Sequence, residues 1–553
     1  METIEIPRRR ITSNGESEPT GNEGLPDIAA TGSPCTAVQP PSLAPGFADI
    51  YGSLTTTQIS VITIGSAIGT GLMVTSGLAM SMSGPAALLI SYSVVGFTVY
   101  LVLSALGEVT AWLPQPYTVA DQAVRFCDPA LGFSLGWIYW LKYAIITPNQ
   151  LVAASLVVSF WVDTDTVNPG VWITIFLLGI IILNNVNNRI PNHVEFYVSS
   201  FKLVVMAALM ILSFVIALGG GPDRDLRGFR YFKEDDLESE KNKDALHRFF
   251  SACGTISPAA FAYIGSERSG IMARASNTRK AISRSINHTF YRLLVFHLLG
   301  ITLVGMMAPR REISAAWIEN VFYYGKAKNP AASPFVAALC LAHIAVAPHL
   351  LNACILLFIL SIANYNLFLA TRAMCDLSLK HRAPRFLSRT NKRGVPIFAL
   401  ALCASLTTIA YINVGCDSAR IFGYFVSMAT MLGILTWISI LLTHISFMRA
   451  RKAQGIPDSV LVFKASFGLL GSLLGLFLCL VISSTMIFNC VQSVGDKTVF
   501  NYRSFLAAYV AVPLYIMLYV GYKFKAKSKH NNPTETDLWS GKSDFQTRAP
   551  FNA

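Results

Sequence analysis

Long apolar runs alternate with short polar connections along most of the chain. Crossing the hydrocarbon core of a bilayer, roughly 30 Å thick, takes about 20 apolar residues in a helix. The pattern therefore predicts an all-α polytopic membrane protein with about 12 transmembrane helices. One run, at 334–378, is longer than a single crossing requires, so we expect it to extend beyond the membrane or to bend at Pro348. The predicted spans lie at residues 57–82, 86–113, 131–161, 171–188, 194–218, 248–272, 286–308, 334–378, 396–415, 418–448, 462–489 and 501–523.

Composition supports the same class of protein. Hydrophobic residues make up 53% of the chain and charged residues 14%, whereas soluble domains carry about 25% charged residues. The formal net charge of +13 is explained by basic loops that face the cytoplasm and lipid headgroups, so membrane lipid is an expected partner and nucleic acid is not.

Polar segments flank the apolar region. Residues 1–56 are rich in Ser, Thr, Pro and Gly and lack the apolar core of a signal peptide, which predicts a disordered cytoplasmic N-terminal tail. Residues 57–523 form the predicted transmembrane transporter domain, and residues 524–553 a cytoplasmic C-terminal tail. Lys and Arg collect in the loops after the sixth, eighth and tenth predicted spans, which places both termini in the cytoplasm.

Three glycines interrupt the first predicted span, at positions 65, 69 and 71. Glycine is unfavourable inside a helix, and Gly69 lies about twelve residues into the span, roughly 18 Å deep and near the bilayer midplane. An unwound backbone there offers amides to an anion and carbonyls to a cation, as a zwitterionic amino acid would need. The alternative is that Gly65 and Gly69 form a small-residue face for helix packing.

A second interruption, Tyr263-Ile264-Gly265-Ser266-Glu267, lies in the sixth predicted span. Inverted-repeat transporters carry paired broken helices at corresponding positions of their two halves, with the substrate between them. An ionisable side chain inside an apolar run, such as Glu267, is a candidate functional group. The alternative is an ion pair between Glu267 and Arg268 or Arg274.

Lys202, in the fifth predicted span, is the other intramembrane charge of interest. A buried lysine can gain and lose a proton during a transport cycle, as proton coupling would require. It could instead extend to the membrane interface. We expect Glu108 and Glu195, which lie closer to predicted cytoplasmic ends, to form structural salt bridges.

The chain resembles the fungal amino acid permeases of the amino acid–polyamine–organocation superfamily, from about Thr57 to Tyr522. The resemblance implies the five-plus-five inverted-repeat transporter fold, with broken helices 1 and 6, and proton-coupled amino acid uptake. The matching segments are residues 65–72, 105–108, 135–140, 195–196 with Lys202, 261–267, 383–386, 393–396, 436–437, 443–447 and 452–456.

The resemblance also implies a set of site residues. Lys202 matches the family lysine thought to replace a coupling sodium ion. Two departures stand out: residues 147–150 read Thr-Pro-Asn-Gln where many relatives have a glutamate, and the loop after the sixth span is one residue shorter than in the family. The implied substrate contacts are Ile64, Ser66, Ala67, Ile68, Gly69, Thr70, Gly71, Tyr263, Ile264, Gly265, Ser266 and Glu267, with Gln150 and Asn364 as candidates for side-chain selectivity.

The predicted function is secondary active import of an amino acid, by proton symport with alternating access, across the plasma membrane or an internal membrane. No covalent chemistry, cofactor or metal is expected, and the chain lacks the short motifs of metalloproteases and hydrolases. Two alternatives stay open: a non-transporting amino acid sensor on a transporter scaffold, and a transporter of a polyamine, a choline-like amine or a specialised metabolite.

Overall fold

The computed structural model describes most of the apolar region. All described residues belong to one unit, residues 43–553, and this part of the chain is helical apart from a short antiparallel hairpin of β1 (Val491–Val494) and β2 (Lys497–Phe500). The predicted tail at residues 1–56 lies outside the described residues. These are 58, 61–62, 64–65, 68–112, 118–162, 164, 166–186, 190–222, 224–233, 245–268, 279–307, 309–311, 313, 333–344, 346–414, 418–461, 463–494 and 497–540.

Nine helical segments of the described chain are long and apolar enough to cross a membrane. They confirm an integral multi-pass membrane protein. The segments are Pro85–Trp112 (α5), Pro129–Val158 (α7), Pro169–Val186 (α8), Val194–Gly220 (most of α9, Ile190–Val215, with η1, Ile216–Gly220), Ala347–Leu379 (α18), Ile397–Val414 (α19, Ile397–Thr407, with η4, Thr408–Val414), Ser418–Ala453 (α20), Gly468–Cys490 (α21, Gly468–Thr485, with η6, Met486–Cys490) and Tyr502–Ala526 (α22, Tyr502–Tyr509, with α23, Ala511–Ala526).

The other three predicted spans correspond to shorter apolar helices. The first contains α3 (Thr70–Met73) and α4 (Thr75–Met82), and the sixth contains α12 (Ala245–Gly254) and α13 (Ile256–Tyr263). The seventh is α15 (Arg279–Met307), whose apolar part is Leu294–Met307. The count of twelve spans stays a prediction, because the first and sixth are broken helices and the seventh begins with a polar stretch.

The long run at 334–378 is divided into two helices. α17 (Pro334–Leu341) ends before α18 begins at Ala347. Pro348 stands in the first turn of α18, where a missing backbone N–H costs nothing. The bend expected at Pro348 therefore lies just before it.

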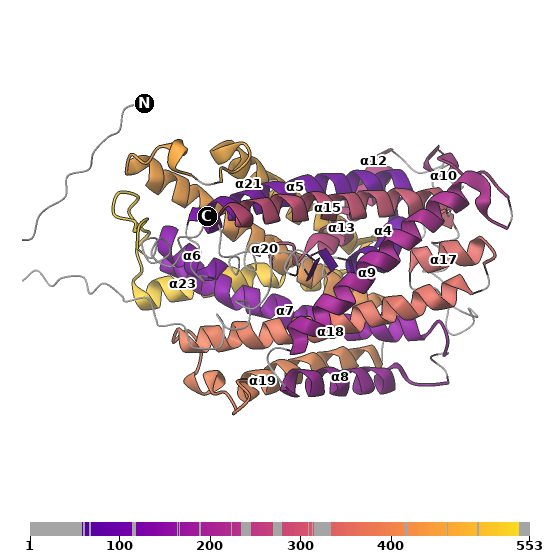
Figure 1. The fold of residues 1–553 in the computed structure, drawn as a ribbon, viewed down its shortest axis with the longest axis horizontal. Coiled ribbons are helices and arrows are strands. Elements are labelled where there is room, and N and C mark those ends of the chain that lie inside the picture. The colour runs from indigo at the N-terminus through magenta and orange to yellow at the C-terminus, as the bar shows by residue number, and fades with distance from the viewer. Residues whose placement is uncertain are drawn as a thin grey trace, which may run out of the picture. The chain divides into compact units, whose positions relative to one another are not determined.

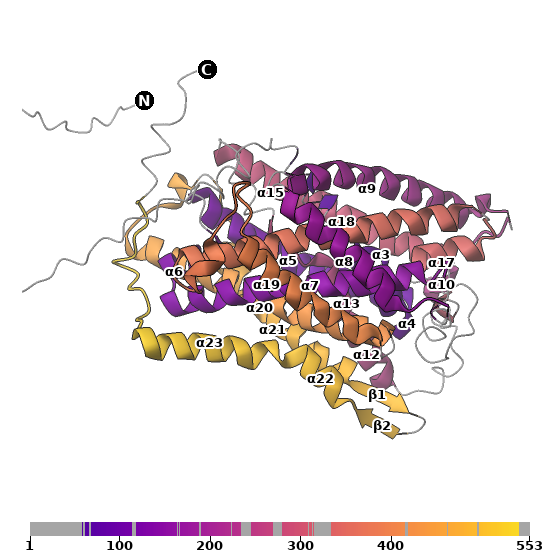
Figure 2. The same cartoon turned by 90° about the horizontal axis from the view of Figure 1, so that it is seen from below.

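Helix α7 is the most enclosed of the long helices. Buried residues make up 89% of its most apolar stretch, compared with 11% for the segment formed by α22 and α23. It packs against α18, α20, α6 (Val119–Phe126) and α23, and the long helices run side by side across Figure 1. In Figure 2, α22 and α23 lie along one edge. Side chains on α7 therefore face the interior of the bundle, while α22 and α23 present mostly exposed apolar surface.

The chain that follows α23 folds back onto α6. Leu538 is fully buried and packs with Trp112, Phe126 and Phe447. Trp112 Nε1 donates to the Leu538 carbonyl at 2.9 Å, and Arg125 pairs with Asp537 at 3.2 Å. This C-terminal segment, residues 528–540, thereby ties α6 to the ends of α5 and α20.

Further hydrogen bonds hold the C-terminal segment in place. The Asn531 side chain donates to the Val124 and Arg125 carbonyls, both at 2.9 Å. Gln454, just beyond α20, donates to the carbonyls of Pro533 and Thr536 at 3.2 and 2.6 Å. The sequence predicted only a polar tail here. A segment this short has no apolar periodicity that would indicate packing against the helices.

We predict that Leu538→Ala releases the C-terminal segment. Truncating a buried leucine costs about 2–5 kcal/mol, and cleavage of a transiently opened segment follows its open population. Trypsin should therefore cut the purified variant at the exposed Lys527 and Lys529 at least about ten-fold faster than the wild type.

The matched control is Leu470→Ala, since Leu470 is 75% exposed on α21. Its cleavage rate should equal that of the wild type. Equal rates for the Leu538 variant and the wild type would show that Leu538 does not anchor the segment.

Candidate functional site

The first predicted span unwinds at Gly69. The Ile68 N–H donates to the Ile64 carbonyl at 3.1 Å, but Gly69 is extended, with φ −159° and ψ −144°, and α3 begins at Thr70. The break lies where the glycine pattern predicted it. Ser66 and Ala67 lie outside the described residues.

The sixth predicted span unwinds after Tyr263. Ile264 has ψ 134°, and Gly265 has φ +97°, a left-handed conformation that glycine adopts without strain. The chain then turns tightly, with the Ser266 N–H donating to the Tyr263 carbonyl at 3.2 Å. Both predicted breaks are therefore present.

Close packing brings the two broken spans together. A Cβ on Gly71 would lie 2.5 Å from Ala262 Cα, so only glycine allows α3 to approach the backbone of α13 this closely. A Cβ on Gly65 would lie 2.3 Å from the Ser199 Cβ of α9. The break and the close contacts thus fall on neighbouring glycines, the break at Gly69 and the close contacts at Gly65 and Gly71.

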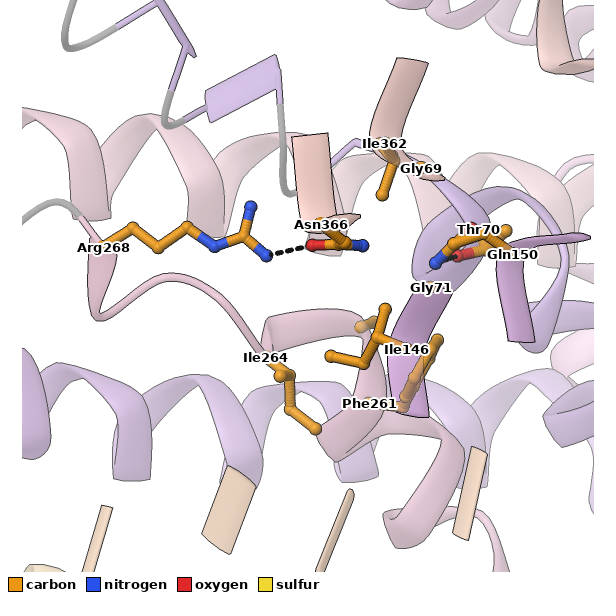
Figure 3. Close-up of a pocket in the computed structure, with 11 residues that line it drawn as sticks. Gly69, Thr70, Gly71, Ile146, Gln150, Phe261, Ile264, Arg268, Ile362 and Asn366 are labelled. Atoms are coloured by element: carbon orange, nitrogen blue, oxygen red, sulfur yellow. Dashed lines mark hydrogen bonds between the residues drawn. The ribbon is translucent and has the colours of Figure 1, made fainter. Parts of the chain in front are cut away.

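A pocket of about 30 Å³ lies at the junction of the two breaks (Figure 3). Of the predicted site residues, five line it: Gly69, Thr70, Gly71, Gln150 and Ile264. The other lining residues, which the sequence did not single out as substrate contacts, are Ile146 of α7, Phe261 and Ala262 of α13, Arg268, and Ile362 and Asn366 of α18.

Polar side chains stand at two places in the pocket wall. On one side, Gln150 Nε2 donates to Thr70 Oγ1 at 2.9 Å. On the other, an Arg268 guanidinium N–H donates to Asn366 Oδ1 at 2.8 Å. Figure 3 shows the Arg268–Asn366 pair to the left of the Thr70–Gln150 pair, with Ile146, Ile264 and Phe261 below them and Ile362 above. The pocket therefore has two polar ends and apolar walls.

Glu267 does not line the pocket. Its carboxylate forms a fully buried ion pair with Lys142 of α7, accepts a hydrogen bond from the Gly265 N–H at 3.0 Å and lies 3.5 Å from Trp437 Nε1 of α20. Of the two partners in the alternative interpretation, Arg268 bonds Asn366 and Arg274 lies outside the described residues. Glu267 thus fixes the unwound segment to α7 and α20.

Lys202 is fully buried, so it does not extend to the interface. Its ammonium lies 3.1 Å from Glu195 Oε1, which also accepts from the Ser199 hydroxyl at 3.1 Å. The second Glu195 oxygen accepts from the Ser361 hydroxyl of α18 at 2.5 Å. The ion pair therefore connects α9 to α18, close to the unwound part of span 1 through Ser199.

Four other predicted contacts do not line the pocket, and two of them bond to other parts of the protein. Tyr263 donates its hydroxyl to the Tyr92 carbonyl at 3.2 Å and stacks on His297. Asn364 Oδ1 accepts from Asn184 Nδ2 of α8 at 2.8 Å. Ile64, like Ser266, is buried without lining the pocket. Substrate contact by these residues stays a prediction.

Glu108, for which we expected a structural salt bridge, is buried beside a histidine. It lies 3.3 Å from His444 Nε2 of α20, a pair that is ionic only when the histidine is protonated, and it accepts from the Ala465 N–H at 2.7 Å. Glu108 thereby links α5 to α20 and to the connection that follows it.

The family model for amino acid permeases matches residues 58–532. The chain belongs to the amino acid permease family. Its relatives include a dicarboxylic amino acid permease of Saccharomyces cerevisiae, 39% identical over 489 residues, which cover 88% of this chain and 79% of the relative.

Two further relatives from the same yeast are also amino acid permeases. The proline-specific permease of Saccharomyces cerevisiae is 31% identical, with 85% of this chain and 75% of the relative covered. The general amino-acid permease GAP1 of that yeast is 30% identical, with 84% and 76% covered. Among solved structures, a manganese transporter of Eremococcus coleocola aligns with a TM-score of 0.48 and 11% identity over 85% of this chain and 94% of that one.

We predict that Lys142→Met strongly destabilises this permease. The substitution leaves Glu267 as a buried charge without its cation, which costs about 3–5 kcal/mol in comparable pairs. The double variant with Glu267→Gln should regain most of the loss, because neither charge remains. Thermal unfolding of the purified proteins in detergent measures both effects.

Lys464→Met is the control for that experiment. Lys464 pairs with Asp458 at 2.7 Å, but both side chains are more than half exposed, so the change should stay within about 1 kcal/mol. A Lys142→Met protein as stable as the wild type would show that the buried pair does not hold the unwound segment against α7.

We also predict that Gly71→Ala impairs uptake. The added methyl group must displace the backbone of α13, and overpacking of this kind costs about 1–3 kcal/mol. Gly84→Ala is the matched control, since no atom lies within 4 Å of its Cβ position. Uptake per molecule of membrane-inserted protein should fall for Gly71→Ala and stay unchanged for Gly84→Ala. Equal uptake by both variants would mean that the contact between α3 and α13 tolerates movement.

Proposed function

We propose that this permease imports an amino acid by proton symport with alternating access, binding it at the junction of the two broken spans. The observation that carries the proposal is the pocket between Gly69–Gly71 and Phe261–Ile264 in a chain of the amino acid permease family. Paired breaks at membrane depth are the usual place for the substrate of an inverted-repeat transporter.

Both charges of an amino acid can be accommodated there. The first amides of a helix have no intrahelical acceptor, so those at the start of α3 suit the α-carboxylate. The last carbonyls of α13, near Tyr263 and Ile264, suit the ammonium group, as does the Gln150 side-chain oxygen, for which the described residues provide no hydrogen-bond partner. We infer that the substrate lies across the two breaks.

Alternating access is supported by the size of the pocket. About 30 Å³ holds one or two water molecules and is too small for an amino acid. Binding therefore requires the walls to separate, and Ile362 of α18, whose Cδ1 occupies the space beside Gly69, is the side chain that must move.

Lys202 is the proposed coupling residue. Lys202 forms an ion pair with Glu195 on its own helix, and the same carboxylate accepts from Ser361 of α18. The positive charge of Arg268 repels Lys202. A proton that leaves or joins Lys202 would change the interaction between α9 and α18, and with it the balance between conformations.

Orientation follows from the basic connections. The connection after α18 carries Arg382, Arg385, Arg389, Lys392 and Arg393, and such clusters mark the cytoplasmic side. We propose that both termini are cytoplasmic and that the protein resides in the plasma membrane, with an internal membrane as the alternative.

Substitution of Lys202 tests the coupling. In permease-deficient yeast, the wild type should accumulate a labelled amino acid faster in acidic than in neutral medium, and a protonophore should abolish accumulation. The double variant Lys202→Met, Glu195→Gln should lose this acid stimulation while still exchanging labelled for unlabelled substrate, because the pocket remains. Lys464→Met, on the surface, should behave as the wild type.

The possible outcomes separate the alternatives. Acid stimulation that survives in the double variant would refute the role of Lys202 but leave amino acid transport in place. Wild-type protein that reaches the membrane and binds but moves no amino acid would favour a sensor. Uptake of polyamines instead would refute the proposed substrate, an outcome disfavoured by the cation of Arg268 in the pocket.

A further inference from the structure

Arg268 introduces a positive charge into the wall of the pocket. Its side chain is buried, and its hydrogen bonds go to the Asn366 amide oxygen and the Tyr143 hydroxyl, at 2.8 and 3.2 Å. Both partners are neutral. Among the residues that the structure describes, no carboxylate forms an ion pair with Arg268. A buried charge whose hydrogen-bond partners are all neutral is costly, so an anion bound in the pocket would stabilise it.

The neighbouring carboxylate does not fulfil this role. Glu267 is adjacent in sequence, but its oxygens are engaged by Lys142 of α7 and by the Gly265 N–H. Glu267 therefore attracts Arg268 electrostatically but forms no ion pair with it, and the Arg268 guanidinium stands in the pocket wall.

Asn366 supplies a second donor at the same place. Arginine can only donate, so Asn366 must turn its oxygen toward Arg268 and its NH₂ group away. That buried NH₂ group has no hydrogen-bond partner among the described residues. A guanidinium and an amide donor thus stand next to each other in the pocket wall (Figure 3).

The guanidinium is also held in orientation. Its central carbon lies 4.8 Å from the centre of the Tyr143 ring and 5.7 Å from that of Tyr365. These cation–π contacts and the two hydrogen bonds restrict its plane, and a fixed guanidinium plane favours paired hydrogen bonds to a carboxylate.

This donor pair and the Thr70–Gln150 pair stand at two ends of the pocket, whose wall also includes the apolar Ile146 and Ile264 (Figure 3). We infer that Arg268 and Asn366 bind a second carboxylate, so that the preferred substrate is an amino acid with an acidic side chain. This inference rests on the proposed function, in which the α-carboxylate occupies the start of α3. The same cation disfavours basic amino acids and polyamines.

Aspartate and asparagine provide the sharpest test, because they have nearly the same size and differ in side-chain charge. Wild-type protein in permease-deficient yeast should take up aspartate with a lower KM than asparagine. In Arg268→Gln the KM for aspartate should rise roughly 10- to 100-fold, the effect of losing a hydrogen bond to a charged group, while the KM for asparagine changes less than about three-fold. Arg268→Lys should regain part of the preference because it keeps the charge.

Two further variants complete the design. Asn366→Leu removes the amide donor at similar size and should raise the KM for aspartate more than that for asparagine. Arg227→Gln is the matched control: Arg227 is also 6% exposed but lies outside the pocket, where it donates to the Met307 carbonyl at 2.7 Å. It should leave the ratio of the two KM values unchanged, even if it lowers the amount of folded protein.

Each result decides between the two proposals. Uptake of neutral but not acidic amino acids by the wild type would overturn the inference and leave the proposed function intact. An equal loss of aspartate and asparagine uptake in Arg268→Gln would overturn it too, since Arg268 would then act only on the structure. Correctly inserted wild-type protein that transports neither compound would overturn the proposed function itself.

Discussion

The constraint on which the rest of the structure depends is that backbone unwound inside a membrane must find partners within the protein. Hydrocarbon offers no hydrogen bonds, and each unsatisfied peptide group costs several kcal/mol. The break after α13 meets this constraint through Glu267, which accepts the Gly265 N–H and is itself neutralised by Lys142. The carboxylate serves the amide and the cation together. The buried ion pair thus supports the unwound backbone beside the pocket, and losing only one of its two charges is what the structure tolerates least.

Buried ionisable side chains connect other pairs of long helices. Glu195 with Lys202 connects α9 to α18 through Ser361, and Glu108 with His444 connects α5 to α20. Such pairs stabilise little compared with apolar packing, but they are expensive to break one partner at a time. A transporter benefits from this property, because its helices can then move as units between a few defined arrangements.

Sequence reasoning predicted the local features of the site better than the distant ones. Gly69 and Gly265 stand at the two breaks, and at Gly265 the positive φ is a local property of the backbone that glycine adopts without strain. The partner of Glu267 could not be found in this way: Lys142 is 125 positions away, and only the packing of α7 brings it there. Lys142 is itself an intramembrane charge, so the rule that identified Lys202 would have identified it as well.

The choice between Asn364 and Asn366 shows a second limit. Both lie on α18, two residues apart, and residues at that spacing point to different sides of a helix. Asn364 meets Asn184 of α8, while Asn366 lines the pocket. The sequence indicates that α18 carries polar residues but not which of its faces turns inward, since that depends on how α7 and α8 pack against it. The docked C-terminal segment is a similar case, because Leu538 is its one fully buried apolar side chain and its hydrogen-bond partners are distant in sequence.

The position of Arg268 connects substrate charge to coupling. In the proposed mechanism, Lys202 and Arg268 are two cations close enough to repel each other. An acidic side chain bound to Arg268 would offset one of these charges and so favour the second positive charge on Lys202. Binding of the substrate and binding of the proton would then assist each other by the same free energy, as linkage requires. A neutral amino acid would leave the repulsion in place, so a single arginine would contribute both to the choice of substrate and to the strength of its coupling.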